Sequence, residues 1–355
     1  MDEKIIHDGA NKDRTLPRYE AVVSGFGEIS DPLFILAPPR SFSSVVCAML
    51  GQHPQMYGLP ETHLFGDETI DRWWGRSAQE TYPMAHGLLR AVAEICFGEQ
   101  TESAVRSAGG WLKRRSSFTS GMIFEDLARE VYPSILVEKS PSIVYSVESM
   151  RRAYQYFPQA RFIHLVRHPR GHGESVLKYL RKLAKREYQS RERRAAQLGP
   201  VPQWVSNLAS FPYSFPGRAA DSQSASTTDP QRGWYVLNMN IVTFLKSVPC
   251  EQSITIRGED LLRDPDRVLR EVVGWMGLQD DAEAIEEMKH PERSPFACFG
   301  PPGARCGNDV LFLQDPALRP ARAAPHSLEG PLQWQPNGNG FLPEVKELAQ
   351  QFGYQ

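Results

Sequence analysis

The sequence predicts an α/β fold, a three-layer sandwich with a central parallel sheet of four to five strands and helices on both faces. Short apolar runs, partly β-branched and typical of strands buried on both faces, alternate with longer stretches of helical periodicity. The chain has 355 residues, 41% of them hydrophobic, so it can bury a large core within one α/β unit. In such a sheet, ligands bind at the carboxyl edge of the strands.

Four apolar runs predict the strands. They are Leu33–Leu36, Ile135–Glu138, Phe162–Val166 and Ser253–Arg257. Helical periodicity predicts the helices that separate and follow them, which are Ser44–Gln52, Ser120–Val131, Pro141–Tyr156, Trp234–Lys246 and Pro265–Met276. The pair Ser140 and Pro141 resembles an N-cap followed by proline at the first helical position, so we expect one helix from there to about Tyr156.

Composition divides the chain into a central domain with two flanking parts. We expect an N-terminal extension over residues 1–30, a domain over 31–313, and a C-terminal segment over 314–355 that packs on the domain. Residues 198–231 are rich in Pro, Ser, Gly and Ala, which is typical of a long surface excursion. We interpret them as an inserted loop or a mobile lid, and a disordered insertion without a role fits their composition equally well.

Composition also excludes several classes of protein. The chain carries 40 Lys and Arg against 42 Asp and Glu, so no global basic field favours nucleic acid. Its five cysteines form no CxxC pair, so we expect a reduced protein without a structural zinc site or a disulfide framework. No apolar run approaches the roughly 20 residues of a membrane span, and the first residues lack the apolar core of a signal peptide. These features predict a cytoplasmic protein.

The first segment with a chemical signature follows the strand expected at Leu33–Leu36. It places an arginine and three serines where a buried strand ends and a helix begins. Free backbone N–H groups and the positive end of a helix dipole attract anions at such a turn. The segment is P-loop-like but lacks the Gly-Lys-Ser/Thr end of a Walker A motif, so a P-loop kinase is the less favoured interpretation. The residues expected to bind ligand here are Pro39, Arg40, Ser41, Phe42, Ser43 and Ser44.

A second segment with the same chemistry follows the strand expected at Phe162–Val166. Arg167 leaves the strand, Pro169 bends the chain, and Ser175 lies on the helix that follows. An arginine and a hydroxyl in this arrangement can hold one phosphate from two sides. Two anion sites at one edge of one sheet predict a ligand with phosphate-like groups at both ends.

With these two segments, the sequence resembles the sulfotransferases that use 3′-phosphoadenosine 5′-phosphosulfate (PAPS), in particular bacterial enzymes similar to tyrosylprotein and polyketide or natural-product sulfotransferases. In that family the first loop binds the 5′-phosphosulfate, and an Arg-x₇-Ser element, here Arg167 to Ser175, binds the 3′-phosphate. Residues 137–141 and 257–265 also resemble family signatures and occur in the family's order. Phe42 is a departure, because relatives often have glycine there. The resemblance implies PAPS as the donor, 3′,5′-adenosine bisphosphate (PAP) as the product, and no required metal.

The resemblance also implies roles for individual residues in sulfuryl transfer. Such a reaction needs a base for the acceptor and positive charge on the sulfuryl and leaving oxygens. Arg40 is expected to stabilise the bridging oxygen and the 5′-phosphate, and Lys139 resembles a family lysine that contacts the transferring group. A lysine paired with Glu138 is the structural alternative for Lys139. Arg305 and Gly307 fall where some relatives return a glycine-containing loop to the nucleotide.

Glu61 and His63 are the two candidates for the catalytic base. They lie at the spacing where relatives of the tyrosylprotein type carry a catalytic glutamate, so Glu61 is the first candidate. His63 is the second, because histidine suits proton transfer at neutral pH without tuning. The sequence leaves the choice open, and a loop polar group that caps a helix is the structural alternative for either residue.

We therefore expect a sulfotransferase that moves a sulfuryl group from PAPS to a hydroxyl of a small-molecule, natural-product or carrier-bound acceptor. Sulfation of an amine and a catalytically silent nucleotide-binding module of the same fold are the alternatives. No nucleic-acid partner and no membrane span are expected. The sequence leaves the oligomeric state open between a monomer and a homodimer.

Overall fold

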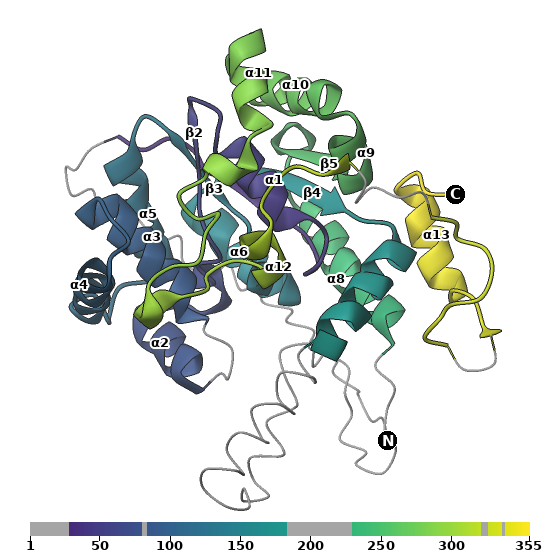
Figure 1. Cartoon of the computed structure of the whole chain (residues 1–355), viewed down its shortest axis with the longest axis horizontal. Helices are drawn as coiled ribbons and strands as arrows, with labels where there is room; N and C mark the ends of the chain where they lie inside the picture. The colour runs from purple at the N-terminus through teal and green to yellow at the C-terminus, as the bar shows by residue number, and fades with distance from the viewer. Residues whose placement is uncertain (1–27, 80–83, 183–228, 321–325, 336–337) are drawn as a thin grey trace, which may run out of the picture.

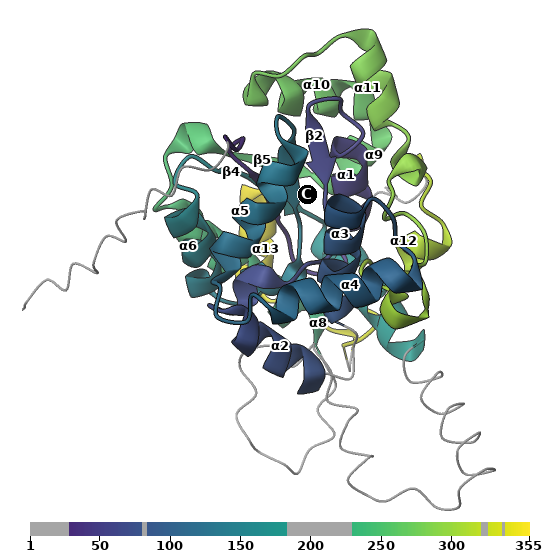
Figure 2. The same ribbon diagram turned by 90° about the vertical axis from the view of Figure 1, so that its left-hand side faces the viewer.

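The computed structural model describes residues 28–79, 84–182, 229–320, 326–335 and 338–355. Its centre is a five-stranded sheet in the order β2-β3-β1-β4-β5, in which every neighbouring pair is parallel. Helices cover both faces of this sheet (Figure 1, Figure 2), which confirms the predicted three-layer α/β fold. The strands are β1 (Leu33–Leu36), β2 (Met56–Gly58), β3 (Ile135–Glu138), β4 (Arg161–Val166) and β5 (Ser253–Arg257).

Helices link and flank the strands. A helix over residues 169–182 directly follows β4. None of the helices in the described part of the chain combines the length and the apolar character that a membrane span requires. The remaining α-helices are α1 (Ser43–Leu50), α2 (Ile70–Gln79), α3 (Ala85–Phe97), α4 (Glu102–Lys113), α5 (Ser120–Val131), α6 (Val147–Tyr156), α8 (Pro230–Leu245), α9 (Gly258–Arg263), α10 (Pro265–Met276), α11 (Ala282–Met288), α12 (Val310–Gln314) and α13 (Pro343–Gln351).

The core lies on both faces of the sheet because side chains of a strand alternate between its faces. Phe34 and Leu36 of β1 pack into a cluster with residues of α3, α5, α6 and α8. Leu33 and Ile35 point the other way and pack with residues of α1, α9, α10 and α11. All four side chains are at most 1% exposed, as expected for a central parallel strand.

Three of the predicted strands are confirmed to the residue, and β4 begins one residue earlier than predicted, at Arg161. The additional strand, β2, has only three residues and pairs with β3. It approaches α1 closely, because a Cβ atom on Gly58 would come within 2.6 Å of the Cys47 carbonyl oxygen. A strand this short, with a glycine in it, carries too little periodicity to be predicted from sequence.

The prediction of a single helix over Pro141–Tyr156 is wrong. The chain forms a 3₁₀ turn over Pro141–Tyr145 and then α6, with extended backbone at Ser146 between them (φ −143°, ψ 149°). Ser146 caps α6, because its hydroxyl accepts a hydrogen bond from the backbone N–H of Ser149. Ser140, the predicted cap, instead accepts a hydrogen bond from the backbone N–H of His63 at 2.8 Å. The predicted cap thus braces a different loop.

Two predicted helices, α5 and α10, have the predicted bounds, whereas α8 begins at Pro230, four residues before the predicted start at Trp234. The Asp229 carboxylate caps this earlier start by accepting a hydrogen bond from the backbone N–H of Gln231 at 3.3 Å. Most of the predicted excursion over residues 198–231 lies outside the described residues, and its last three residues are the cap and first turn of α8.

The C-terminal part of the chain packs on α8 and on the helix over 169–182. An apolar cluster joins α8 to α13 and the residues before it, and it includes Trp234, Leu332, Phe341, Val345 and Leu348. The Arg170 guanidinium donates hydrogen bonds to backbone carbonyl oxygens of Ser327, Glu329, Gly330 and Pro331. These contacts fasten residues 326–335 to the helix that carries Arg170.

Candidate active site

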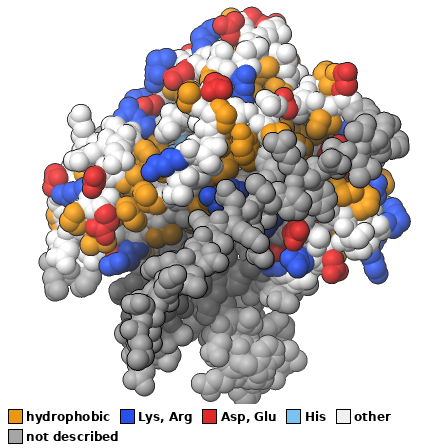
Figure 3. All heavy atoms as spheres, turned by 180° about the vertical axis from the view of Figure 1, so that it is seen from behind, with side chains coloured by type: hydrophobic (Ala, Val, Ile, Leu, Met, Phe, Trp, Pro, Cys, Tyr) orange, Lys and Arg blue, Asp and Glu red, His pale blue; other side chains and the backbone are white. Residues whose placement is uncertain are grey.

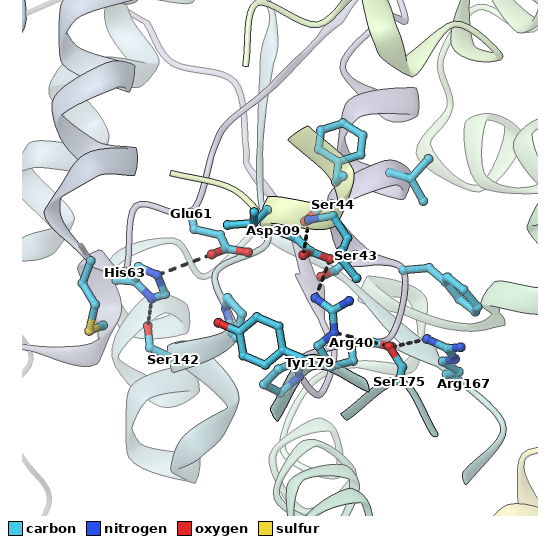
Figure 4. A pocket seen from close by; sticks show the side chains of 18 of the residues that line it. Arg40, Ser43, Ser44, Glu61, His63, Ser142, Arg167, Ser175, Tyr179 and Asp309 are labelled. Carbon is cyan, nitrogen blue, oxygen red and sulfur yellow. Dashed lines mark hydrogen bonds and ion pairs between the residues drawn. The ribbon is translucent and has the colours of Figure 1, made fainter. Parts of the chain in front are cut away.

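A cavity of about 1190 Å³ lies at the carboxyl edge of β1, β3 and β4. Its walls are the turn after β1, the start of α1, the loop of Glu61, the turn after β3, the helix over 169–182, and α12 (Figure 4). This is the edge at which an open parallel sheet binds ligands. The predicted site residues on its wall are Pro39, Arg40, Phe42, Ser43, Ser44, Glu61, His63, Arg167 and Ser175.

The other predicted site residues are not part of this wall. Ser41 is fully buried, and its hydroxyl has no hydrogen-bond partner among the described residues. Lys139 is buried, but its ammonium group contacts two residues of the wall. Gly307 lies behind Glu61 and accepts the Glu61 backbone N–H at 2.7 Å, while Arg305 is exposed. Nucleotide binding by Arg305 and Gly307 therefore stays a prediction.

The turn after β1 holds two residues in left-handed backbone. Arg40 has φ 72° and Phe42 has φ 68°. This conformation costs a residue other than glycine about 1–3 kcal/mol, and such strain clusters at ligand-binding turns. Phe42 is the N-cap of α1 and makes no side-chain capping bond, so the first N–H groups of α1 stay available to an anion.

The two predicted anion-binding segments meet at the cavity. The Arg167 Nη1 donates a hydrogen bond to the carbonyl oxygen of Arg40 at 2.6 Å, and its guanidinium lies 4.1 Å from the centre of the Phe42 ring. Arg40 donates through Nε to the Ser175 hydroxyl at 3.3 Å. Arg40, Ser175 and Arg167 are therefore joined by direct contacts into one continuous basic wall (Figure 4).

Asp309 is a member of the site that sequence analysis missed. One of its carboxylate oxygens lies 2.5 Å from Nη1 of Arg40. The other accepts the backbone N–H of Leu311 at 3.0 Å, so the same side chain caps α12. A single aspartate before a short helix forms no recognisable motif, and only the fold brings it to Arg40. The contact places a negative charge directly on the arginine of the first anion loop.

Glu61, His63 and Lys139 form a second group, and Figure 4 shows the first two on the opposite side of the cavity from Arg167. The Lys139 ammonium donates hydrogen bonds to Glu61 Oε1 at 2.7 Å and to the Ser44 hydroxyl at 2.9 Å. The His63 ring nitrogen Nε2 lies 3.8 Å from Glu61 Oε2. Lys139 thus connects the first candidate base with the anion loop.

The charges of this group favour an ionised Glu61. Burial raises the pKa of the Glu61 carboxyl, but the Lys139 ammonium and His63 outweigh this effect and lower it to about 2. The carboxylate is therefore ionised at neutral pH, as a base must be, but so low a pKa makes it a weak proton acceptor while Lys139 is paired with it. His63 is oriented by a contact of 3.0 Å between its Nδ1 and the Ser142 hydroxyl, so its Nε2 faces Glu61.

Glu138 fixes the turn that carries Lys139. Its carboxylate accepts hydrogen bonds from the Thr62 hydroxyl at 2.9 Å, from the backbone N–H of Ser140 at 3.0 Å, and from that of Lys139. Burial raises the pKa of Glu138, and these donors oppose the rise. The described contacts of the Lys139 ammonium are with Glu61 and Ser44 on the cavity wall. Glu138 therefore holds the backbone of the turn and does not pair with the ammonium group.

We predict that the Glu61–Lys139 ion pair makes stability depend on pH. Because the pKa of Glu61 in the folded chain, about 2, lies below its ordinary value of 4.5, the contribution is complete above pH 4.5 and disappears as the pH falls to about 2. Glu61→Gln breaks the buried pair at any pH, at a cost of about 3–5 kcal/mol at neutral pH. Urea unfolding midpoints of the two proteins should differ at pH 7 and converge between pH 4.5 and 2. A difference that does not change with pH would contradict this role.

The position of Glu61 depends on a glycine in α3. A Cβ atom on Gly87 would lie 1.8 Å from the Glu61 carbonyl oxygen, so only glycine lets α3 approach this loop. We expect Gly87→Ala to displace Glu61, to lower activity and to destabilise the fold by about 1–3 kcal/mol. Gly109→Ala is the matched control, because the nearest atom there is 3.8 Å away in the interior of α4. It should stabilise the fold by about 0.5–1 kcal/mol, measured by urea unfolding. Equal effects of the two changes would contradict the steric argument.

The sequence pattern of the sulfotransferase family matches residues 32–212, which is half of the chain and includes both anion-binding segments. The chain belongs to the sulfotransferase family. No curated protein sequence matches this sulfotransferase significantly. Among the described residues, no group of three or more His, Cys, Asp or Glu side chains is arranged to hold a metal ion.

Solved structures agree with the fold of this sulfotransferase. A sulfotransferase domain from the curacin biosynthetic pathway is 21% identical, with a TM-score of 0.63 over 94% of this chain and 99% of that one. A sulfotransferase domain from the Synechococcus PCC 7002 olefin synthase is 22% identical, with a TM-score of 0.64 over 94% of this chain and 98% of that one. Both likenesses extend over the C-terminal part that the family pattern does not cover.

Proposed function

We propose that this sulfotransferase transfers a sulfuryl group from PAPS to an acceptor hydroxyl by direct in-line displacement. One observation carries the proposal: a single cavity joins the anion loop of Arg40, the basic clamp of Arg167 and Ser175, and the ionised Glu61. A donor with a phosphosulfate at one end and a phosphate at the other matches this distribution of charge. A base beside the phosphosulfate end matches the chemistry of the transfer.

The residues present fit this donor. The Nε–H group of Arg167 is buried and has no hydrogen-bond partner among the described residues, so it can take a phosphate oxygen. Burial lowers the pKa of Arg167 to about 10, which leaves its guanidinium charged at neutral pH. At the other end, the hydroxyls of Ser43 and Ser44 and the N-terminus of α1 line the wall next to Arg40. We assign the 3′-phosphate to Arg167 and the 5′-phosphosulfate to the loop of Arg40.

In the proposed reaction, Glu61 accepts the proton of the acceptor hydroxyl while the acceptor oxygen forms a bond to sulfur. The bond between sulfur and the bridging oxygen breaks, and its electron pair stays on the 5′-phosphate of PAP. Arg40 and Lys139 hold the charge that develops on the sulfuryl and leaving oxygens, and Lys139 does so through its contact with Ser44. His63 is the alternative base, because it lines the same cavity wall and its Nε2 lies 3.8 Å from Glu61 Oε2.

For the acceptor, we propose a small molecule, a natural product or a carrier-bound chain that bears a hydroxyl. The names of the two similar structures, from the curacin pathway and an olefin synthase, support testing such acceptors first. An amine acceptor is the alternative. The described part of the cavity wall near His63 includes Met84 and Tyr145, which offer apolar contact to an acceptor.

The test is a transfer assay with sulfur-labelled PAPS and a panel of hydroxyl and amine acceptors. We expect release of PAP together with a gain of one sulfuryl group on at least one hydroxyl acceptor. If the label appears on an amine acceptor and on none of the alcohols, the assignment changes from a hydroxyl to an amine acceptor. Tight binding of PAP without turnover of any donor, even by hydrolysis, would overturn the proposal in favour of a silent nucleotide-binding module.

A further prediction concerns Asp309, whose carboxylate pairs with the Arg40 guanidinium, the group that we assign to the 5′-phosphosulfate of the donor. We expect Asp309→Asn to increase PAP affinity about three- to fivefold, because it removes a partly exposed negative charge next to the bound phosphate. Asp315→Asn is the matched control on the same wall, since the carboxylate of Asp315 pairs with Arg319 at 2.8 Å. Calorimetric titration measures both. Weaker binding to Asp309→Asn would contradict the prediction and would make Asp309 a support of Arg40.

A further inference from the structure

The C-terminal segment brings a histidine next to Gly171, at the Arg167 end of the cavity wall. Gly171 lies on the cavity wall, in the helix over 169–182. A Cβ atom built on Gly171 would lie 2.7 Å from Nε2 of His326 and 3.4 Å from Nε of Arg167. Because Gly171 has no side chain, the imidazole nitrogen and the guanidinium nitrogen can both lie close to this one residue of the cavity wall.

One of these two nitrogens has no partner. The Nε–H group of Arg167 is buried and makes no hydrogen bond within the described residues, although its Nη1 donates to the Arg40 carbonyl oxygen. Buried donors are almost always paired, so an unpaired one on the cavity wall indicates a ligand oxygen there. The Ser175 hydroxyl, one helical turn beyond Gly171, lines the same wall.

The position of His326 is fixed by its neighbours in the chain. The Arg170 guanidinium donates hydrogen bonds to four carbonyl oxygens within the next five residues, and the first of them is that of Ser327. The Trp334 ring lies against Gly173, where a Cβ atom would come within 2.5 Å of it. Gly171 and Gly173, two positions apart on the helix, thus let the C-terminal segment approach closely enough to reach Arg167.

We infer that His326 binds the 3′-phosphate of the nucleotide together with Arg167 and Ser175. This inference rests on the proposed function and adds a residue from the C-terminal segment to the nucleotide site. A phosphate oxygen that lies between the two nitrogens can accept from the Arg167 Nε–H and from the His326 Nε2–H together. His326 would distinguish a nucleotide that carries a 3′-phosphate from one that does not.

The charged groups around His326 come from three elements. His168 lies with its ring centre 5.4 Å from that of His326, and Arg167, Arg170, Glu174 and Glu259 act on it electrostatically. Burial and the two arginines lower the pKa of His326 in the absence of a ligand. A phosphate dianion raises it again, so binding takes up a proton, and affinity for the 3′-phosphate falls as the pH rises through the bound-state pKa.

The test compares PAP with adenosine 5′-monophosphate, which lacks the 3′-phosphate, by calorimetric titration of the full chain. We expect His326→Ala to weaken PAP about tenfold and to leave adenosine 5′-monophosphate unchanged. Gly171→Ala, whose methyl group would displace the His326 ring, should have the same selective effect. His290→Ala is the matched control, because its ring contacts only Glu286 and Glu292 among the described charged groups. It should change neither affinity.

Three results separate this inference from the proposed function. If the wild-type chain does not bind PAP, the proposed function fails. If PAP binding is lost in Arg167→Ala but kept in both His326→Ala and Gly171→Ala, only the inference fails. Equal loss of both nucleotides in His326→Ala would also overturn it, because that pattern indicates a general distortion. Should His326→Ala not fold, His326→Gln, which keeps a donor on a side chain of similar reach, must retain most of the selectivity for PAP.

Discussion

Replacing Arg167 with alanine is expected to weaken PAP binding by about 2–4 kcal/mol, or roughly 30- to 1000-fold. The guanidinium is buried, it stays charged at neutral pH, and its Nε–H group has no partner among the described residues. The change removes a positive charge from a buried phosphate, and nothing else in this wall replaces it directly. Calorimetric titration measures the loss, and an unchanged affinity would defeat the assignment of the 3′-phosphate to Arg167.

An arginine at the other end of β4 serves as a control, because it separates the loss of a charge at the phosphate site from a loss of stability. Arg161 starts β4, at the end opposite Arg167, where it donates to the Trp275 carbonyl oxygen and lies over the Trp275 ring. Arg161→Ala should lower stability without changing PAP affinity. The Arg167 guanidinium also stacks on Phe42, so part of its effect acts through the first loop. The change in affinity for adenosine 5′-monophosphate measures that part, because this nucleotide has no 3′-phosphate for Arg167 to bind.

The second large effect concerns the base. Glu61→Gln is expected to lower turnover at least tenfold, and by about 10²–10⁴-fold if Glu61 alone takes the proton. The amide keeps the shape of the side chain but cannot accept a proton, and it no longer holds the Lys139 ammonium as an ion pair. Donor affinity should stay nearly the same, because Glu61 is not part of the basic wall. Steady-state kinetics together with PAP titration of the same sample show whether the loss is in chemistry.

His63 provides the comparison for this experiment. If Glu61 is the base, His63→Gln should lower turnover less than Glu61→Gln. In that case His63 only helps to position the Glu61 carboxylate and to lower its pKa. Full activity of Glu61→Gln would shift the role of base to His63. A loss of PAP binding in Glu61→Gln would instead indicate that breaking the buried ion pair had distorted the anion loop.

The sequence predicted the features that depend on local pattern. Strands buried on both faces read as apolar runs, so β1, β3 and β5 were predictable to the residue. The meeting of the two anion segments follows from the same fact. Because β1 and β4 are neighbours, with Leu36 opposite His164, the residues that follow them leave the sheet at the same level.

Features that depend on distant contacts were not predictable. The Ser140 hydroxyl accepts a hydrogen bond from the backbone N–H of His63, 77 positions away in the chain, so Ser140 does not cap a helix and α6 begins only after Ser146. Asp309 meets Arg40 only because the chain returns to the cavity after α11. His326 reaches Gly171 because the C-terminal segment is held by Arg170. Ser146, Asp309 and His326 do not belong to a sequence motif. Each takes its position from contacts with residues that are distant in the chain.

The structure of the protein bound to PAP is the most direct test of the central claim, which is that one nucleotide spans both basic turns. We predict the 5′-phosphate at the turn of Arg40 and the N-terminus of α1, and the 3′-phosphate on Arg167 and Ser175. A nucleotide whose two phosphates lie in separate cavities, or which leaves Arg167 without a phosphate contact, would contradict the account.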